Sequence, residues 1–159
     1  MSARAAWRLE TLGFTRVFRY SPGLGGWLAT GLPSEGTDAS TPRAGDVADR
    51  GVPTCALHDR LGDVRERLRA AGETSCIVVN DQRVVLGRVR GKALDGDGEQ
   101  PVEAVMEAGP TTVRPSEPLA ALIERMQKRR AGSIVVSMPD GVLVGVLRRE
   151  DGERRLAER

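Results

Sequence analysis

The chain has 159 residues, of which 40% are hydrophobic, 29% charged and 3% aromatic. The 24 basic residues nearly balance 22 acidic ones, and a net charge of only +2 argues against a dedicated nucleic-acid-binding protein. No apolar run is long enough to span a bilayer, the first residues lack the apolar core of a signal peptide, and two cysteines make no disulfide framework. We therefore expect a cytoplasmic protein that binds a ligand and is not an enzyme, because a single histidine leaves most acid–base triads incomplete.

Residues 1–36 predict a helix, a strand and a short second helix. The first helix covers residues 3–12 and ends at Gly13, the strand covers residues 14–20, and the second helix lies around residues 27–29. These few elements cannot form an independent core. Their large aromatic side chains must pack on the rest of the chain, pack on a second chain, or stay partly exposed: Trp7, Phe14, Phe18 and Trp27. Residues 37–44 have the composition of a linker.

The remainder of the chain contains an internal repeat at an offset of 58 positions. Residues 45–93 align with residues 103–151 without a gap, and both identities and apolar positions coincide. The identical pairs include Val47/Val105, Thr54/Thr112, Ser75/Ser133, Gly87/Gly145 and Arg90/Arg148. We therefore divide this part into two repeats, residues 45–97 and 98–159.

Each repeat predicts the element order β-α-β-β-α, which places the chain in the α/β (α+β) class. In the second repeat, Ser116 is the candidate N-cap of a helix, and two strands joined by a turn follow it. In the first repeat, Asp59 is the candidate cap. One such unit is marginal alone. We expect the two to pack as a pseudo-two-fold pair with two equivalent clefts between them, a usual place for a small ligand.

The pair resembles a tandem CBS-domain pair, also called a Bateman module, over residues 45–157. The resemblance rests on the element order, on the opening "EAVM" followed by "TTV" at residues 103–113, and on the closing "GVLRRED" at residues 145–151. It implies a regulatory or dimerisation module that binds an adenine nucleotide or an adenosyl ligand, such as AMP, ADP, ATP or S-adenosylmethionine. It also implies a homodimer. The charge balance and the short apolar runs predict neither nucleic acid nor membrane as a partner.

The family's closing motif places a hydroxyl residue near the ligand phosphate and an Asp at the ribose. The second repeat keeps Gly145 and Asp151 but has Arg148 at the hydroxyl position, whereas the first has Arg90 and Ala93 at the two positions. Arg148 would either donate to a phosphate or pair with Asp151 or Glu150. The resemblance therefore favours the second-repeat site, with these ligand-binding residues: Thr112, Val113, Ser133, Ile134, Gly145, Arg148 and Asp151.

Residues 1–36 are similar to the C-terminal end of a rhodanese domain. The similarity rests on "RAAWRL", "LGF", "VFRY" and the "GWL…GLP" ending. In that family the catalytic cysteine precedes this helix, but here only Met1, Ser2 and Ala3 do. The segment is therefore predicted to be a remnant that lacks the catalytic cysteine, so sulfurtransferase activity is not carried over.

Three expectations about function follow. The leading one is a non-catalytic regulatory module that binds an adenosyl ligand mainly at the second-repeat site. The alternatives are a structural or dimerisation module with empty clefts, and a truncated piece of a rhodanese–CBS protein. Cys55 and Cys76 are expected to be small buried core residues, and His58 a solvated loop residue.

Overall fold

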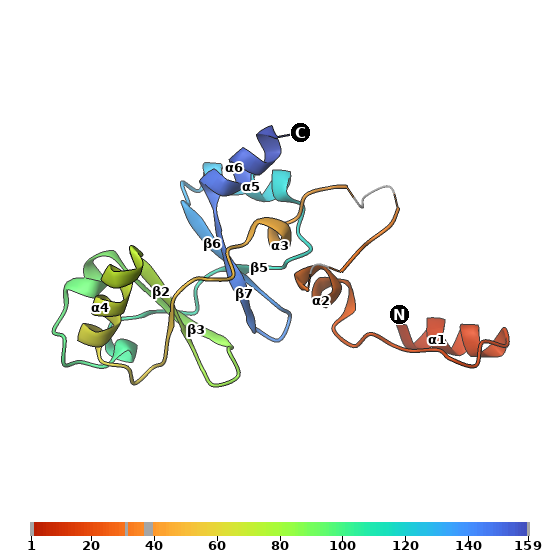
Figure 1. Ribbon diagram of the computed structural model, residues 1–159, viewed down its shortest axis with the longest axis horizontal. Coiled ribbons are helices and arrows are strands. Elements are labelled where there is room, and N and C mark those ends of the chain that lie inside the picture. The colour runs from red at the N-terminus through yellow and green to blue at the C-terminus, as the bar shows by residue number, and fades with distance from the viewer. Residues whose placement is uncertain (1, 31, 37–39, 159) are drawn as a thin grey trace.

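The computed structural model describes residues 2–30, 32–36 and 40–158 of the chain (Figure 1). The helices are α1 (Ser2–Thr11), α2 (Gly23–Ala29), α3 (Ala44–Val47), α4 (Leu61–Ala71), α5 (Leu119–Lys128) and α6 (Arg149–Ala157), with 3-10 turns η1 (Gly91–Asp95) and η2 (Val102–Ala104). The strands are β1 (Thr54–Cys55), β2 (Ser75–Val79), β3 (Val85–Arg90), β4 (Glu107–Ala108), β5 (Thr112–Val113), β6 (Ser133–Ser137) and β7 (Leu143–Arg148).

Two small sheets form the centre of the molecule. One has the order β1-β2-β3-β4 and the other β5-β6-β7, and each begins with a parallel pair followed by an antiparallel hairpin. The hairpin registers repeat with the offset found in the sequence, since Ser75 pairs with Arg90 and Ser133 with Arg148. In both hairpins the strand register also shifts at the same repeat position, between Val78 and Val79 in the first and between Val136 and Ser137 in the second. These features confirm the α/β class and the strand order of the duplication. After β3, however, the first repeat has the 3-10 turn η1 in place of the expected final α-helix.

The segment that leads into each repeat packs on the other repeat. Residues 42–49 lead into β1 of the first repeat, yet Ala44 and Ala48 belong to the hydrophobic core under α5. Residues 98–108 precede β5, yet Val102 is buried in the core under α4, and β4 pairs with β3. Asp49 forms the matching bridge to Val146 of β7. Each sheet thus pairs with a backbone segment that leads into the other repeat.

These exchanged segments also cap the first helix of each repeat, which corrects the expected caps. Neither Asp59 nor Ser116 is an N-cap, because the helices start later, after Arg60 and Pro118. The amide of Leu61 instead donates to the carbonyl of Gln100 at 3.0 Å, and the amide of Leu119 donates to the carbonyl of Pro42 at 2.9 Å. Backbone carbonyls of the exchanged segments therefore satisfy the free amides at both helix starts.

A third apolar cluster joins the two repeats. Its buried members come from both sheets: Ile77, Val135, Leu143 and Val146. The tips of the two hairpins also exchange backbone hydrogen bonds, with Val85 N donating to Gly141 O at 3.0 Å and Leu143 N donating to Arg83 O at 2.9 Å. The repeats are therefore held by a shared core and by backbone pairing at one end.

The N-terminal segment differs from its prediction in one element. Residues 14–20 form no strand, and Phe18 is 81% exposed. A strand needs a neighbour for its backbone hydrogen bonds, and α1 and the chain after it extend away from both sheets (Figure 1). Only α2 is anchored, because Leu28 and Ala29 are buried. One of the outcomes expected for the aromatic side chains is found, because exposed side chains occur at Trp7, Phe14 and Phe18.

Replacing Gly145 tests whether the exchange of segments stabilises the fold. A Cβ at this position would overlap the backbone carbonyl of Asp49 and disturb its pairing with Val146. We expect Gly145→Ala to lower the free energy of unfolding by about 1–3 kcal/mol in a urea titration. Gly132→Ala is the matched control, because nothing lies near its Cβ position. Equal stability of the two variants would contradict the importance of this close approach.

Candidate functional site

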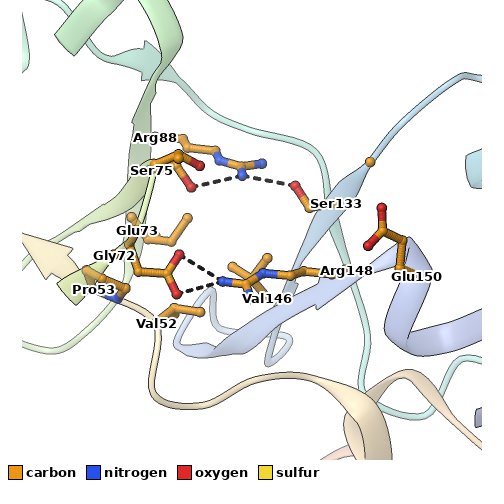
Figure 2. A pocket seen from close by; sticks show the side chains of 13 residues that line it. Val52, Pro53, Gly72, Glu73, Ser75, Arg88, Ser133, Val146, Arg148 and Glu150 are labelled. Atoms are coloured by element: carbon orange, nitrogen blue, oxygen red, sulfur yellow. Dashed lines mark hydrogen bonds and ion pairs between the residues drawn. The ribbon is translucent and has the colours of Figure 1, made fainter. Parts of the chain in front are cut away.

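A cleft of about 340 Å³ lies between the repeats, and we call it the inter-repeat cleft (Figure 2). On the side of the first repeat, the walls come from the segment before β1, the α4–β2 connection, β2 and β3. On the side of the second repeat, they come from β6, β7 and the start of α6. The lining residues are Val52, Pro53, Gly72, Glu73, Thr74, Ser75, Ile77, Arg88, Gly132, Ser133, Val146, Arg148 and Glu150. The cleft is therefore built jointly by both halves of the duplication.

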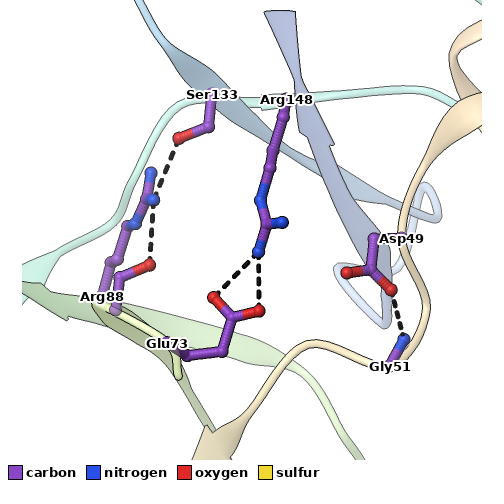
Figure 3. A network of polar contacts seen from close by, with 7 residues as sticks. Asp49, Gly51, Glu73, Arg88, Ser133 and Arg148 are labelled. Atoms are coloured by element: carbon purple, nitrogen blue, oxygen red, sulfur yellow. Dashed lines mark hydrogen bonds and ion pairs between the residues drawn. The ribbon is translucent and has the colours of Figure 1, made fainter. Parts of the chain in front are cut away.

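Arg88 lies between the two repeats at the inner side of the cleft. Its Nη2 donates to Ser75 Oγ at 3.1 Å and to Ser133 Oγ at 2.9 Å, so it bridges the two serines that are equivalent in the repeat (Figure 3). Burial, and then repulsion from Arg90, lowers the pKa of Arg88. Its Nε is buried without a hydrogen-bond partner, and no carboxylate within the described ranges forms an ion pair with it. Arginine stays charged in proteins, so Arg88 presents a cation to the cleft, and the charge of Glu107 offsets it only in part.

Arg148 crosses the cleft and pairs with Glu73 of the other repeat. Its Nη2 lies 2.7 Å from one carboxylate oxygen of Glu73 and 2.8 Å from the other (Figures 2 and 3). The Arg148 side chain is 47% exposed and that of Glu73 26%. Hydrogen bonding to Glu73, and its negative charge, raise the pKa of Arg148. The pairs expected with Asp151 or Glu150 do not form, because the side chain points toward the first repeat.

A second cleft of about 330 Å³ lies at the pseudo-equivalent position. It is lined by Arg88, Arg90, Glu107, Pro110, Thr111 and residues 129–135. Arg90, the counterpart of Arg148, pairs here with Glu107 at 3.0 Å. Arg88 and Ser133 border both clefts. The two clefts therefore share one cation, and their remaining polar side chains differ.

The predicted ligand-binding residues do not all meet at one place. Ser133 and Arg148 line the inter-repeat cleft, whereas Thr112, Val113 and Ile134 line a separate hollow beside α5. Ser133 and Ile134 also line the second cleft. Gly145 packs against the backbone of Asp49, and Asp151 pairs with Arg154 at 2.6 Å within α6. The closing end of one repeat faces the opening strand of the other, so residues of both repeats form each cleft.

Sequence reasoning missed most of the inter-repeat cleft, and only part of it could have been found. Ser75 is the repeat counterpart of Ser133, and this identity is a usable signal. Glu73 and Arg88 have Ala131 and Val146 as counterparts, so the repeat gives no signal for either. Their roles depend on contacts across the repeat boundary, which the alignment of one repeat on the other does not contain.

Two further properties of the described residues limit the chemistry. Over residues 2–30, 32–36 and 40–158, no group of three or more His, Cys, Asp and Glu side chains is arranged to hold a metal ion. None of the helices in these ranges combines the length and the apolar character that a membrane crossing requires. The polar side chains that line the inter-repeat cleft are two arginines, three hydroxyl residues and two glutamates.

Residues 102–157 match the family model of the CBS domain. No curated protein matches the chain. The sequence stretch recognised by the family model begins at η2 and ends in the last turn of α6. This covers the second repeat and supports the CBS resemblance there, whereas the rhodanese resemblance of residues 1–36 stays a prediction.

Solved structures extend the comparison to both repeats. A protein described as an acetoin utilization protein (AcuB) from Vibrio cholerae is 24% identical, with a TM-score of 0.65 over 73% of this chain and 90% of that one. CBSX2 in complex with AMP is 21% identical, with a TM-score of 0.65 over 73% of this chain and 96% of that one. CBSX2 is from Arabidopsis thaliana.

A third solved structure is the CBS domain pair of protein MJ0100 in complex with 5-methylthioadenosine and S-adenosyl-L-methionine. It is 16% identical, with a TM-score of 0.62 over 74% of this chain and 98% of that one. At these identities the likeness establishes the fold. Residues 102–157 thus match the family model of the CBS domain, and the two repeats together have the fold of a CBS-domain pair.

Proposed function

We propose that the chain is a non-catalytic regulatory module and that its inter-repeat cleft binds an adenine nucleotide or a related adenosyl ligand. The observation that carries the proposal is the placement of two arginines, Arg88 and Arg148, in one cleft that also has an apolar wall. Guanidinium groups bind phosphate through paired hydrogen bonds. A ligand with an apolar ring at one end and an anionic group at the other matches this arrangement.

The two ends of the cleft suggest an orientation for the ligand. Val52, Pro53, Ile77 and Val146 provide apolar contact suited to a flat base. Arg88 lies with Ser75 and Ser133, and Figure 2 shows Arg148 with its partner Glu73 between this group and Val52. We place the base against the apolar residues and the phosphate, or another anionic group, at the arginines. This division between apolar contact and a few polar groups is typical of small-molecule sites.

The ribose contact is assigned to the start of α6. Glu150 lines the cleft, and Asp151 follows it in the same helical turn. The resemblance implies that Asp151 accepts hydrogen bonds from the ribose hydroxyls, and its carboxylate is engaged by Arg154 instead. Because this ion pair is largely exposed, it is weak, so rotation of Asp151 toward a bound ribose costs little.

Two solved relatives of similar fold support the class of ligand. One is a complex with AMP, and the other a complex with 5-methylthioadenosine and S-adenosyl-L-methionine. These molecules share an adenosine moiety and differ in the group attached to its ribose. The arginines of this chain favour a ligand whose attached group is negatively charged.

Binding of AMP, ADP, ATP and S-adenosylmethionine is the first test. A ligand present at 100 times its dissociation constant stabilises the folded state by about 2.7 kcal/mol, which raises the melting temperature by roughly 5–10 °C for a chain of this size. We expect such a shift with at least one phosphate-bearing ligand, measured by differential scanning fluorimetry. If none of the four ligands shifts the melting temperature of the folded protein, the structural alternative is favoured.

Removal of Arg148 tests the site itself. A charge-assisted hydrogen bond contributes about 1.5–3 kcal/mol, so Arg148→Ala is expected to weaken binding of the nucleotide at least about tenfold in isothermal titration calorimetry. Arg60→Ala is the matched control, because Arg60 pairs with Glu99 outside the cleft. Unchanged affinity in Arg148→Ala would place the ligand elsewhere.

Glu73 is expected to compete with the ligand for Arg148. A phosphate at Arg148 must displace the Glu73 carboxylate, or share the guanidinium with it at the cost of repulsion between two anions. Glu73→Gln removes that repulsion and keeps the shape of the side chain. We expect the dissociation constant of a phosphate-bearing nucleotide to fall about two- to fivefold, in line with the modest energy of partly exposed ion pairs.

The same titration needs two controls. Adenosine carries no phosphate, so its affinity is expected to be equal in Glu73→Gln and the unaltered chain. Glu124→Gln removes a carboxylate that pairs with Lys128 on the surface of α5, and it should leave both ligands unaffected. Weaker nucleotide binding in Glu73→Gln would mean that Glu73 orients Arg148 for the ligand and does not oppose it.

A further inference from the structure

The only two cysteines of the chain lie side by side in the core of the first repeat. Cys55 Sγ and Cys76 Sγ are 2.9 Å apart, and both residues are buried, with 4% and 2% of their surfaces exposed. Both are free thiols. A disulfide bond has a sulfur–sulfur distance of about 2 Å, so the two sulfurs need to approach each other by only about 1 Å.

The second repeat fills the same two positions with apolar side chains. The counterparts of Cys55 and Cys76 are Val113 and Ile134. Packing of this core therefore does not require sulfur at either position. The pairing of two thiols is a property of the first repeat alone, and it has no use in the binding of a nucleotide.

The surroundings give the two thiols different chemistry. The hydrogen bond between the two sulfurs lowers the pKa of Cys76; burial opposes this, and the positive charge of Arg67 adds to the lowering. The same hydrogen bond, burial and the charge of Cys76 raise the pKa of Cys55. Arg67 is held by Asp59 at 2.6 Å. A cysteine of lowered pKa next to a second cysteine is common in pairs of an attacking and a resolving thiol.

We propose that Cys55 and Cys76 form a reversible intramolecular disulfide when the protein meets a peroxide. The Cys76 thiolate attacks one oxygen of hydrogen peroxide, the O–O bond breaks, and Cys76 becomes a sulfenic acid while the other oxygen leaves as water after protonation. The Cys55 sulfur then attacks the sulfenic sulfur, the S–OH bond breaks, and a second water leaves with the Cys55 proton. The two thiols lose two electrons, and the peroxide is reduced.

The strand register predicts what the bond does to the fold. Cys55 pairs with Val78, so Cys76 lies two residues earlier along β2, on the same face of the sheet. Bond formation therefore draws β1 along β2 toward the start of that strand. Pro53 lies two residues before Cys55, Ser75 directly precedes Cys76, and both line the inter-repeat cleft. The disulfide thus joins two walls of the cleft from the core side.

The test uses the whole chain and does not depend on nucleotide binding. The reduced protein is treated with hydrogen peroxide, quenched, unfolded and alkylated, and its intact mass is measured. We expect the number of alkylatable thiols to fall from two to none and the mass of the monomer to fall by two hydrogens, with both changes reversed by dithiothreitol. Because the chain has no other cysteine, a monomeric product identifies the pair without mapping.

The single variants separate the two roles. Cys55→Ala lacks the resolving thiol, so Cys76 sulfenic acid should accumulate and be trapped by dimedone. Cys76→Ala should react with peroxide more slowly. Retention of both thiols in the unaltered chain, a disulfide-linked dimer, or addition of oxygen without loss of both thiols would each overturn the proposal. The result on the unaltered chain decides it even where a variant fails to fold.

Discussion

The structure depends on the exchange of leading segments between the two repeats. Residues 42–49 complete the second repeat and residues 98–108 complete the first, through backbone bonds that also cap α4 and α5. The close approach of Asp49 to Gly145 is possible because glycine has no Cβ. Neither repeat can be removed without exposing the core of the other. The joint construction of the inter-repeat cleft follows from this exchange, because it fixes the closing end of one repeat opposite the opening strand of the other.

Duplication gave two clefts of similar volume, about 340 and 330 Å³, and divergence then made their chemistry unequal. The asymmetry comes from a few substitutions at equivalent positions. Arg88 stands where the second repeat has Val146, and Glu73 where it has Ala131. Arg88 borders both clefts, so an anion held by it in one cleft leaves less positive potential for the other. This favours occupation of one cleft at a time. The second cleft is lined by Arg88, Arg90, Arg129 and Arg130, whereas the inter-repeat cleft combines Arg88 and Arg148 with an apolar wall.

The sequence predicted those features that depend on local pattern. The offset of 58 positions and the apolar spacing are reproduced in the hairpin registers, where Ser75 pairs with Arg90 as Ser133 pairs with Arg148. Features that depend on contacts between distant segments were not predicted. Helix capping by Gln100 and Pro42 carbonyls is one such feature, because any residue can supply a carbonyl.

The missing strand at residues 14–20 has a related cause. Its apolar pattern suits a strand, but the segments beside it in the described part of the chain are the helices α1 and α2, with which it forms no ladder. The site residues follow the same rule. Arg148 was predicted because the motif contains its position, whereas Glu73, its partner at 2.7 Å, comes from the other repeat and belongs to no motif.

The two faces of β2 connect the cysteine pair with the cleft. Alternate residues of a strand point to opposite faces, so Cys76 and Val78 face the core under α4, while Ser75 and Ile77 face the second repeat. A covalent bond to Cys76 constrains the backbone that also carries Ser75, and Ser75 accepts a hydrogen bond from Arg88. A shift of β1 relative to β2 would therefore affect Arg88 through its hydrogen bond to Ser75. Packed cores transmit such displacements because they contain little free volume.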